Sequence, residues 1–196
     1  MTGYVDVREQ ADKDFHRALF KASLYRWKGR LHTRNSHNEY LLSFDEAQST
    51  LVRSSQAYVG MRVVEVEKIT GSVGRYKDFD PSFLPCKKNM IERWCRVDSA
   101  YHRGVELPAV TLYKVGEAYF VSDGNHRVSV ARYHKAAAID AEVIELRGHT
   151  LNAQGHEAGS LPQGPQNPTQ PRASWLRNLW QHTRRSLWWP EVRPLA

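Results

Sequence analysis

The segment LPAVTLYKVGEAYFVSDGNHRVSVARYHK, residues 107–135, constrains the fold more than any other part of the chain. It holds two short apolar runs on either side of a Gly-Glu pair at 116–117, a pattern that predicts a β-hairpin. After Gly124 the apolar spacing becomes helical, with Val128 and Ala131 facing a core. The hairpin and the helix must therefore pack within one unit, and the neighbouring segments indicate its class.

Three neighbouring segments complete a small domain of roughly residues 58–147. MRVVEVEKI at 61–69 and AIDAEVIEL at 138–146 alternate between apolar and polar residues and predict strands. Residues 89–103 have a helical period of apolar residues, and Gly104, directly after them, is a helix-stop signal. The stretch TGSVGRYKDFDPSFLP, before this helix, predicts a structured loop. The order strand, helix, hairpin, helix, strand predicts an α+β fold with a small mixed sheet.

Segments of different composition flank this domain. Residues 1–57 form an N-terminal helical extension, in which 8–28 predict an amphipathic helix. Residues 148–171 are rich in Gly, Pro, Gln and Asn and predict a flexible linker. Residues 172–196 place leucines and a tryptophan on one face and arginines elsewhere, which predicts a tethered basic amphipathic helix.

The net charge of +7 belongs to these flanks. Residues 59–146 carry 13 Lys and Arg against 12 Asp and Glu, whereas residues 147–196 carry six Arg against two Glu. Residues 15–37 hold six basic residues, no acidic ones, and interleaved aromatic rings. The N-terminal and C-terminal basic helices are the expected contacts for nucleic acid or an anionic membrane surface. A solvated helix face, or packing of the tail on the domain itself, explains the same residues.

Neither export nor membrane insertion is expected. No run reaches the roughly 20 apolar residues that span a bilayer, and the first twenty residues hold four acids and no apolar signal core. Cys86 and Cys95 form neither a metal spacing nor a disulfide framework, and His102, His134 and His149 show no zinc-ligand spacing. We expect a cytoplasmic protein with reduced thiols, held at a membrane or nucleoid by its basic ends, with the oligomeric state left open.

The strand-to-helix corner DGNHR, residues 123–127, is the strongest candidate site. A helix N-terminus leaves N–H groups unpaired and carries about half a positive charge. Gly124 allows a sharp turn and the close approach of a ligand. Asn125 and His126 can donate hydrogen bonds, and Arg127 offers a fork suited to phosphate. Together these residues predict an anion-binding cradle.

Asp123 has three open roles, because a carboxylate does not bind phosphate directly. It could hold a metal ion that bridges to phosphate, orient His126 or Arg127, or cap the helix. An architectural reading of the corner is also open, in which Arg127 only pairs with Asp123 or Asp140.

These residues resemble the ParB/sulfiredoxin-like superfamily, in its ParB-like nuclease-domain group. The resemblance rests on FVSDGNHRVSVAR preceded by LPAVTLYKVGEAY, and it covers about residues 60–146. Domains of this family bind nucleotide phosphates at this helix start, CTP in ParB and ATP in sulfiredoxin and the free serine kinases. The resemblance implies a nucleoside triphosphate, CTP or ATP, which we expect to bind with Mg²⁺ held by Asp123. The implied phosphate contacts are Gly124, Asn125, His126 and Arg127.

The loop GSVGRYKDF, residues 71–79, lies where relatives place nucleotide or substrate contacts. Ser72 and Arg75 are its candidate phosphate ligands, and Asp78 could act as a metal ligand or base. A solvated ion pair between Arg75 and Asp78 explains these two residues equally well. The loop is no Walker motif, because the lysine and its spacing are missing.

Differences between this motif and those of known family members reduce the number of functions that the resemblance implies. Sulfiredoxin-like enzymes have a cysteine between the glycine and the His-Arg pair, where this chain has Asn125, so sulfinic-acid reduction is not expected. Partition-type ParB has a glutamate there and continues into a helix-turn-helix domain, where this chain has the predicted linker. Serine-kinase relatives keep Asp-Gly-x-His-Arg, so phosphotransfer stays open.

Three functions compete on this evidence. The first is a nucleotide- or phosphate-binding protein that acts as a regulatory or DNA-associated switch. The second is an enzyme, a nucleotide hydrolase, phosphotransferase or nuclease, in which Asp123 and His126 are catalytic. The third is a non-catalytic structural interaction protein in which the motif only holds the corner together.

Overall fold

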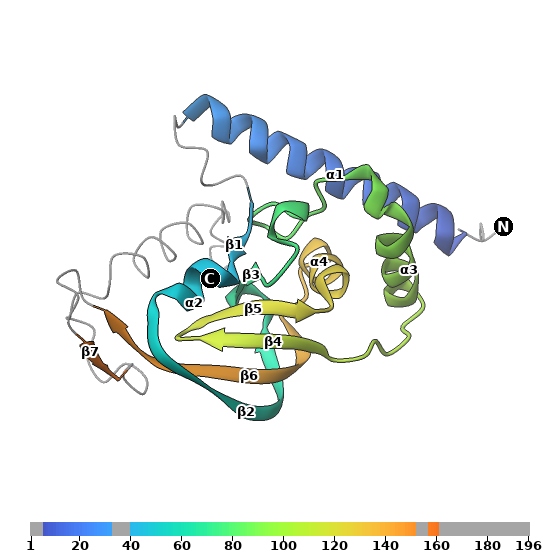
Figure 1. Cartoon of the computed structure of the whole chain (residues 1–196). Coiled ribbons are helices and arrows are strands. Elements are labelled where there is room, and N and C mark those ends of the chain that lie inside the picture. The colour runs from blue at the N-terminus through green and yellow to red at the C-terminus, as the bar shows by residue number, and fades with distance from the viewer. Residues whose placement is uncertain (1–5, 33–39, 152–156, 161–196) are drawn as a thin grey trace, which may run out of the picture.

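Figure 1 shows the computed structural model of the chain, which describes residues 6–32, 40–151 and 157–160. The helices in these ranges are α1 (Val7–His32), α2 (Phe44–Ser49), α3 (Ile91–His102) and α4 (Asn125–Tyr133). The strands are β1 (Leu42–Ser43), β2 (Leu51–Glu65), β3 (Ile69–Ser72), β4 (Val110–Val115), β5 (Ala118–Asp123), β6 (Ala138–Leu151) and β7 (Glu157–Ser160). Short 3₁₀ turns lie at Val66–Lys68, Tyr76–Asp78 and Lys88–Met90.

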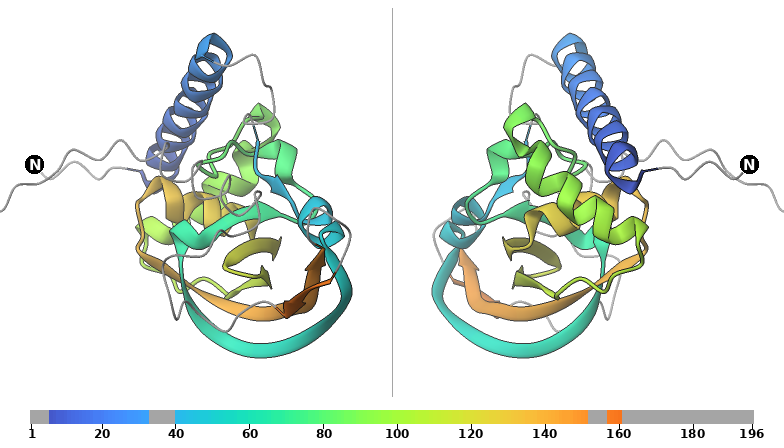
Figure 2. Two further views of the ribbon diagram at one scale, coloured as in Figure 1. Left: turned by 90° about the vertical axis from the view of Figure 1, so that its left-hand side faces the viewer. Right: turned by 90° about the vertical axis from the view of Figure 1, so that its right-hand side faces the viewer.

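The strands form one mixed sheet in the order β1-β3-β5-β4-β6-β2, with β7 paired to β6. The hairpin β4–β5 and the pairs β2–β6 and β6–β7 are antiparallel, whereas β1–β3, β3–β5 and β4–β6 are parallel. The long strands β2 and β6 curve together along one side of the molecule (Figure 2). This arrangement confirms the predicted α+β fold with a mixed sheet.

The sheet also includes strands from segments that the sequence pattern predicted as a loop, an N-terminal extension or a linker. β3 lies largely in the stretch predicted as a loop, because four residues that are mostly buried show no alternation to detect. β1, α2 and the start of β2 come from the predicted extension, residues 1–57. Within the predicted linker, 148–171, β6 continues to Leu151 and β7 pairs with it. The rest of that linker and the helix predicted at 172–196 lie outside the described residues.

Apolar side chains pack in two clusters on opposite faces of the sheet. Phe120 and Val121 are successive residues of β5, so their side chains point to opposite faces, and they belong to different clusters. α1, α3 and α4 contribute to the larger cluster, in which Trp94 is fully buried and donates from Nε1 to Ser129 Oγ at 3.0 Å. α2 contributes to the smaller cluster.

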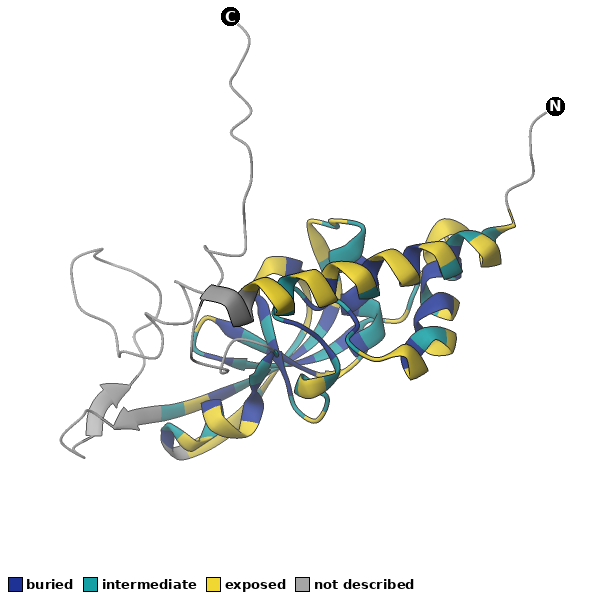
Figure 3. Cartoon of the chain, turned by 90° about the horizontal axis from the view of Figure 1, so that it is seen from above, coloured by how far each residue is buried: buried dark blue, intermediate teal, exposed yellow. Residues whose placement is uncertain are grey.

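α1 packs on the larger cluster through a narrow face of mostly small side chains, as Figure 3 shows by burial. The fully buried positions on this face are Ala11, Phe15, Ala18 and Ala22. Phe15 meets Trp94 of α3 edge to face, with ring centroids 5.7 Å apart. The helix predicted for residues 8–28 is confirmed, but it is only weakly amphipathic, because Phe20 and Trp27 are exposed while its buried face is mostly alanine. Among the described helices, none is long and apolar enough to cross a membrane.

Gly71 provides a test of this packing, because β3 approaches its neighbours too closely for a side chain. A Cβ atom at this position would lie 2.3 Å from Phe120 Cδ1 and 2.6 Å from the carbonyl oxygen of Leu42. We expect Gly71→Ala to lower the free energy of unfolding by about 1–3 kcal/mol, measured by urea denaturation. Gly74→Ala is the matched control, since a Cβ there meets nothing within 4 Å. Equal stability of the two variants would contradict the described packing of β3.

Candidate functional site

The corner between β5 and α4 depends on Gly124. This residue is the N-cap of α4 and has φ +97, a left-handed conformation that side chains rarely adopt. A Cβ atom there would also lie 2.6 Å from Val110 Cγ1 of β4. The glycine therefore lets α4 start directly against the sheet. Within the described residues no side chain caps the helix, so the N–H groups of its first turn are available to a ligand.

A cavity of about 570 Å³ opens at this helix start. Its walls come from the loop after β3, from α3, from the end of β5 and from the first turn of α4. The lining residues are Val73, Gly74, Arg75, Arg93, Arg96, Val97, Ser122, Asp123, Gly124, Asn125, His126 and Arg127. The structure thus brings six of the eight candidate site residues to one cavity, and Ser72 and Asp78 are the exceptions.

Ser72 lies in the sheet and has its hydrogen bonds within the protein. The residue is fully buried, and its hydroxyl donates to the carbonyl oxygen of Val121 at 3.3 Å. Ser72 Oγ in turn accepts from the backbone N–H of Arg75, also at 3.3 Å. Ser72 accordingly holds the start of the loop that carries Arg75 and does not line the cavity.

Arg127 binds the protein scaffold with most of its donors. Nη1 donates to the carbonyl oxygens of Pro108 and Ala109, the latter at 2.7 Å, and Nη2 donates to Asp123 Oδ2. These contacts connect the first turn of α4 to the segment that enters β4. The guanidinium is mostly buried, whereas the Asp123 side chain is 76% exposed. This ion pair agrees with the interpretation in which Arg127 only holds the corner together, although Arg127 also lines the cavity.

His126 is held as a neutral imidazole. Its Nε2 lies 3.2 Å from Nη1 of Arg75, and because a guanidinium can only donate, Nε2 is the acceptor and Nδ1 carries the hydrogen. Nδ1 is buried and has no hydrogen-bond partner among the described residues. Burial and the positive charges of Arg75 and Arg93 lower the pKa of His126 to about 4.

Asp78 anchors the loop on the other side of the cavity. Arg75 Nε donates to its Oδ2 at 2.8 Å, and Lys87 Nζ donates to its Oδ1 at 2.5 Å. Burial opposes ionisation of this carboxyl, but the hydrogen bonds from Lys87 and Arg75 outweigh burial and hold its pKa below the ordinary value. Arg75 and Asp78 thus form the ion pair that was one of their two interpretations. This pairing through Nε leaves Nη1 of Arg75 directed at His126.

Two arginines of α3, Arg93 and Arg96, line the cavity without having been predicted. They are three residues apart and so share one side of the helix, opposite the buried Trp94. Arg96 pairs with Glu92 at 3.1 Å, and both side chains are exposed. Within the described part of the chain Arg93 has no ion-pair partner. Their helical spacing is visible in the sequence, but the direction of that face depends on how α3 packs.

The described lining residues of the cavity include one carboxylate and no cysteine. Of the described lining residues only Asp123 is acidic, and one of its oxygens already accepts from Arg127. Mg²⁺ usually needs one or two carboxylates together with phosphate oxygens, so Asp123 fits it only once a phosphate ligand is present. The pKa of Cys86 is raised to about 11 and that of Cys95 to about 12, in both mainly by burial, and neither thiol lines the cavity.

Comparison with known proteins gives one partial likeness. No family model and no curated protein matches the chain. Among solved structures, the crystal structure of sulfiredoxin from Arabidopsis thaliana is similar to 42% of this chain and 82% of its own, with 19% sequence identity and a TM-score of 0.30.

The neutral state of His126 can be tested by NMR titration of its imidazole. With a pKa of about 4, its ring signals should stay unchanged from pH 8 down to about pH 5. Arg75→Gln removes a positive charge and the donor to Nε2, so the pKa of His126 should rise. A wild-type His126 that titrates near pH 6.5 would contradict the described contacts.

The same shift makes stability depend on pH. An unfolded chain protonates His126 at about pH 6.5, whereas the folded chain does so only near pH 4. The contribution of His126 to the free energy of unfolding is therefore fully present above pH 6.5 and is lost as the pH falls towards 4. Asp80 acts in the opposite sense, because burial raises its pKa to about 6. We therefore expect wild type to lose more stability than His126→Gln between pH 6.5 and pH 4, measured by denaturant unfolding. Equal losses of stability in wild type and His126→Gln would contradict the lowered pKa of His126.

Proposed function

We propose that the cavity binds the phosphate groups of a nucleoside triphosphate, and that the protein acts as a nucleotide-dependent regulatory switch. The observation that carries the proposal is the arrangement of four arginines around the uncapped start of α4. Arg75, Arg93, Arg96 and Arg127 reach the cavity from three separate elements. Arginine suits phosphate because its planar fork can donate two parallel hydrogen bonds.

Charge balance supports an anionic ligand. Arg127 and Arg96 have carboxylate partners, and Arg75 shares Asp78 with Lys87. Arg93 has no such partner within the described residues, yet it lies close enough to His126 to lower its pKa. A polyphosphate would relieve this repulsion and would accept hydrogen bonds from the first N–H groups of α4.

The composition of the walls favours recognition of phosphate over recognition of a base. A volume of about 570 Å³ is in the range of small-molecule sites. No Phe, Tyr or Trp side chain is among the described lining residues, so the cavity offers no stacking platform. Asn125 is 7% exposed, and its Oδ1 is buried without a partner in the described chain. A hydroxyl of the ligand or a bound water would satisfy this acceptor.

The contacts of the two candidate catalytic residues favour binding over turnover. Nε2 of His126 accepts from Arg75, and Nδ1 is buried, so neither ring nitrogen is placed to take a proton from a substrate. Asp123 is paired with Arg127. A switch would act through other surfaces, and α1 presents exposed Phe20 and Trp27 beside basic residues as a candidate contact for nucleic acid or anionic membrane.

Arg93→Gln should weaken nucleotide binding at least tenfold, or about 1.4 kcal/mol, because it removes the cavity's unpaired positive charge and leaves the scaffold contacts of Arg127 intact. The measurement is isothermal titration of the full chain with ATP, CTP and inorganic triphosphate, with and without Mg²⁺. Arg103→Gln is the matched control, since this residue is exposed at the end of the same helix. We expect inorganic triphosphate to compete with both nucleotides.

The outcomes separate the three candidate functions. If none of the three ligands binds, the proposal is overturned and the structural interaction protein remains as the interpretation. Turnover of ATP or CTP that is lost in Asp123→Asn or His126→Gln would favour the enzyme. Equal weakening by Arg93→Gln and Arg103→Gln would mean that the anions bind without using the cavity.

A further inference from the structure

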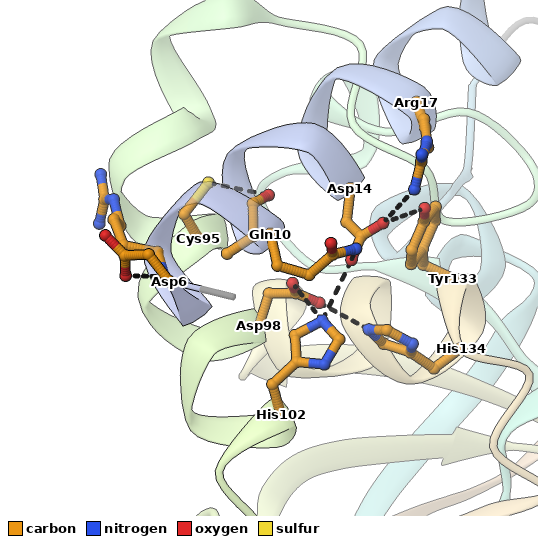
Figure 4. Close-up of polar contacts among 11 residues, drawn as sticks. Asp6, Gln10, Asp14, Arg17, Cys95, Asp98, His102, Tyr133 and His134 are labelled. Atoms are coloured by element: carbon orange, nitrogen blue, oxygen red, sulfur yellow. Dashed lines mark hydrogen bonds and ion pairs between the residues drawn. The ribbon is translucent and has the colours of Figure 1, made fainter. Parts of the chain in front are cut away.

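A second group of convergent polar side chains lies at the other end of α4, where the helix ends beside α1 and α3. Figure 4 shows its members, which we call the Asp/His cluster. The cluster consists of Asp14 on α1, Asp98 and His102 on α3, and His134 directly after α4. One ligand atom from each residue lies within 4.8 Å of all the others.

Two of the distances within the cluster are close to those between the ligands of a tetrahedral metal ion. Nε2 of His102 lies 3.1 Å from Asp14 Oδ2 and 3.3 Å from Asp98 Oδ2. Tetrahedral ligands that are each about 2.0–2.1 Å from a metal ion lie about 3.3 Å from one another. Nε2 of His134 is closer to Asp98 Oδ1, at 2.6 Å, and would have to retreat by less than about 1 Å. Asp98 and His102 are four residues apart and so share one face of α3.

Hydrogen bonding alone leaves the cluster incomplete. His102 Nε2 has one hydrogen to donate but faces a carboxylate oxygen on each of Asp14 and Asp98. It bonds to Asp14, so Asp98 Oδ2 is buried without a hydrogen-bond partner in the described chain. Asp98 is 0% exposed and Asp14 is 4% exposed. Arg17 already pairs with Asp14 at 3.2 Å, whereas within the described residues Asp98 pairs only with the two histidines, so its buried carboxylate needs compensating positive charge. A divalent cation would supply that charge and would use the unpartnered oxygen.

We propose that the Asp/His cluster is a binding site for a divalent transition-metal ion, with Zn²⁺ as the best fit. Imidazole nitrogen and carboxylate oxygen are both zinc ligands, and four protein ligands with no open position describe a structural site. Asp14 has the surroundings of a ligating carboxylate, because Gln10 and Tyr133 donate to its two oxygens at 2.9 and 2.8 Å. The sequence pattern had indicated no zinc site, since the ligands come from three distant segments.

The metal would join α1 to the rest of the domain. α1 contributes only Asp14, whereas α3 and the end of α4 contribute the other ligands. The helix otherwise packs through Phe15 and a row of alanine side chains, and the alanines bury little area each. Zn²⁺ binding should therefore raise the melting temperature of the full chain.

The first experiment measures Zn²⁺ binding to the full-length protein by competition with a chromophoric chelator, after removal of metal with EDTA. We expect one equivalent to bind and the melting temperature to rise. Asp98→Asn keeps the shape of the side chain and removes its charge, so the affinity should fall at least tenfold. His16→Gln is the control, because His16 is exposed on α1 outside the cluster and should leave the affinity unchanged.

A second measurement needs no variant and so holds even if Asp98→Asn fails to fold. Co²⁺ added to wild-type protein should give the intense visible absorption of a tetrahedral site, without the thiolate charge-transfer band that Cys86 or Cys95 would produce. Failure to bind one equivalent of Zn²⁺ would overturn the proposal and leave an ion-pair network. So would a thiolate band, or an Asp98→Asn affinity equal to that of wild type.

Discussion

The close contact between Gly124 and Val110 is the constraint on which the rest of the site depends. Because no side chain separates them, α4 begins directly on the sheet, next to the hairpin strand β4. Arg127 then reaches back to the carbonyl oxygens at 108–109 and locks the first turn in place. With this turn fixed, the uncapped N–H groups of α4 and the imidazole of His126 face one cavity together with α3.

The arginines near the cavity have two different roles: some hold the fold together, and others are available to a ligand. Arg127, which the motif singles out, holds the corner together, and Arg132 of the same helix donates to the carbonyl oxygen of Ile69 in β3. Arg93 and Arg96 come from a different element and complete the basic lining. A motif residue can thus be a scaffold residue, while its neighbours in space carry the charge that a ligand would meet.

Local patterns sufficed for most of the helices and strands and for half of the residues that line the cavity. The hairpin, α1, α3 and α4 were predictable because turns and apolar periodicity are properties of a few adjacent residues. β3 was not, because it is short and its glycine is required by contact with Phe120, far along the chain. Arg93 and the Asp/His cluster share this difficulty: their partners lie on other elements, so only tertiary packing brings them together.

The nine residues of α4 set the distance and the angle between its two ends, at Gly124 and His134. One inserted residue would displace the far end by about 1.5 Å and rotate it by about 100°. Either His134 would then turn away from α3, or the first turn would leave Val110. The length of α4 is therefore constrained at both ends, so an insertion or deletion within the helix should disturb the two ends more than a substitution does.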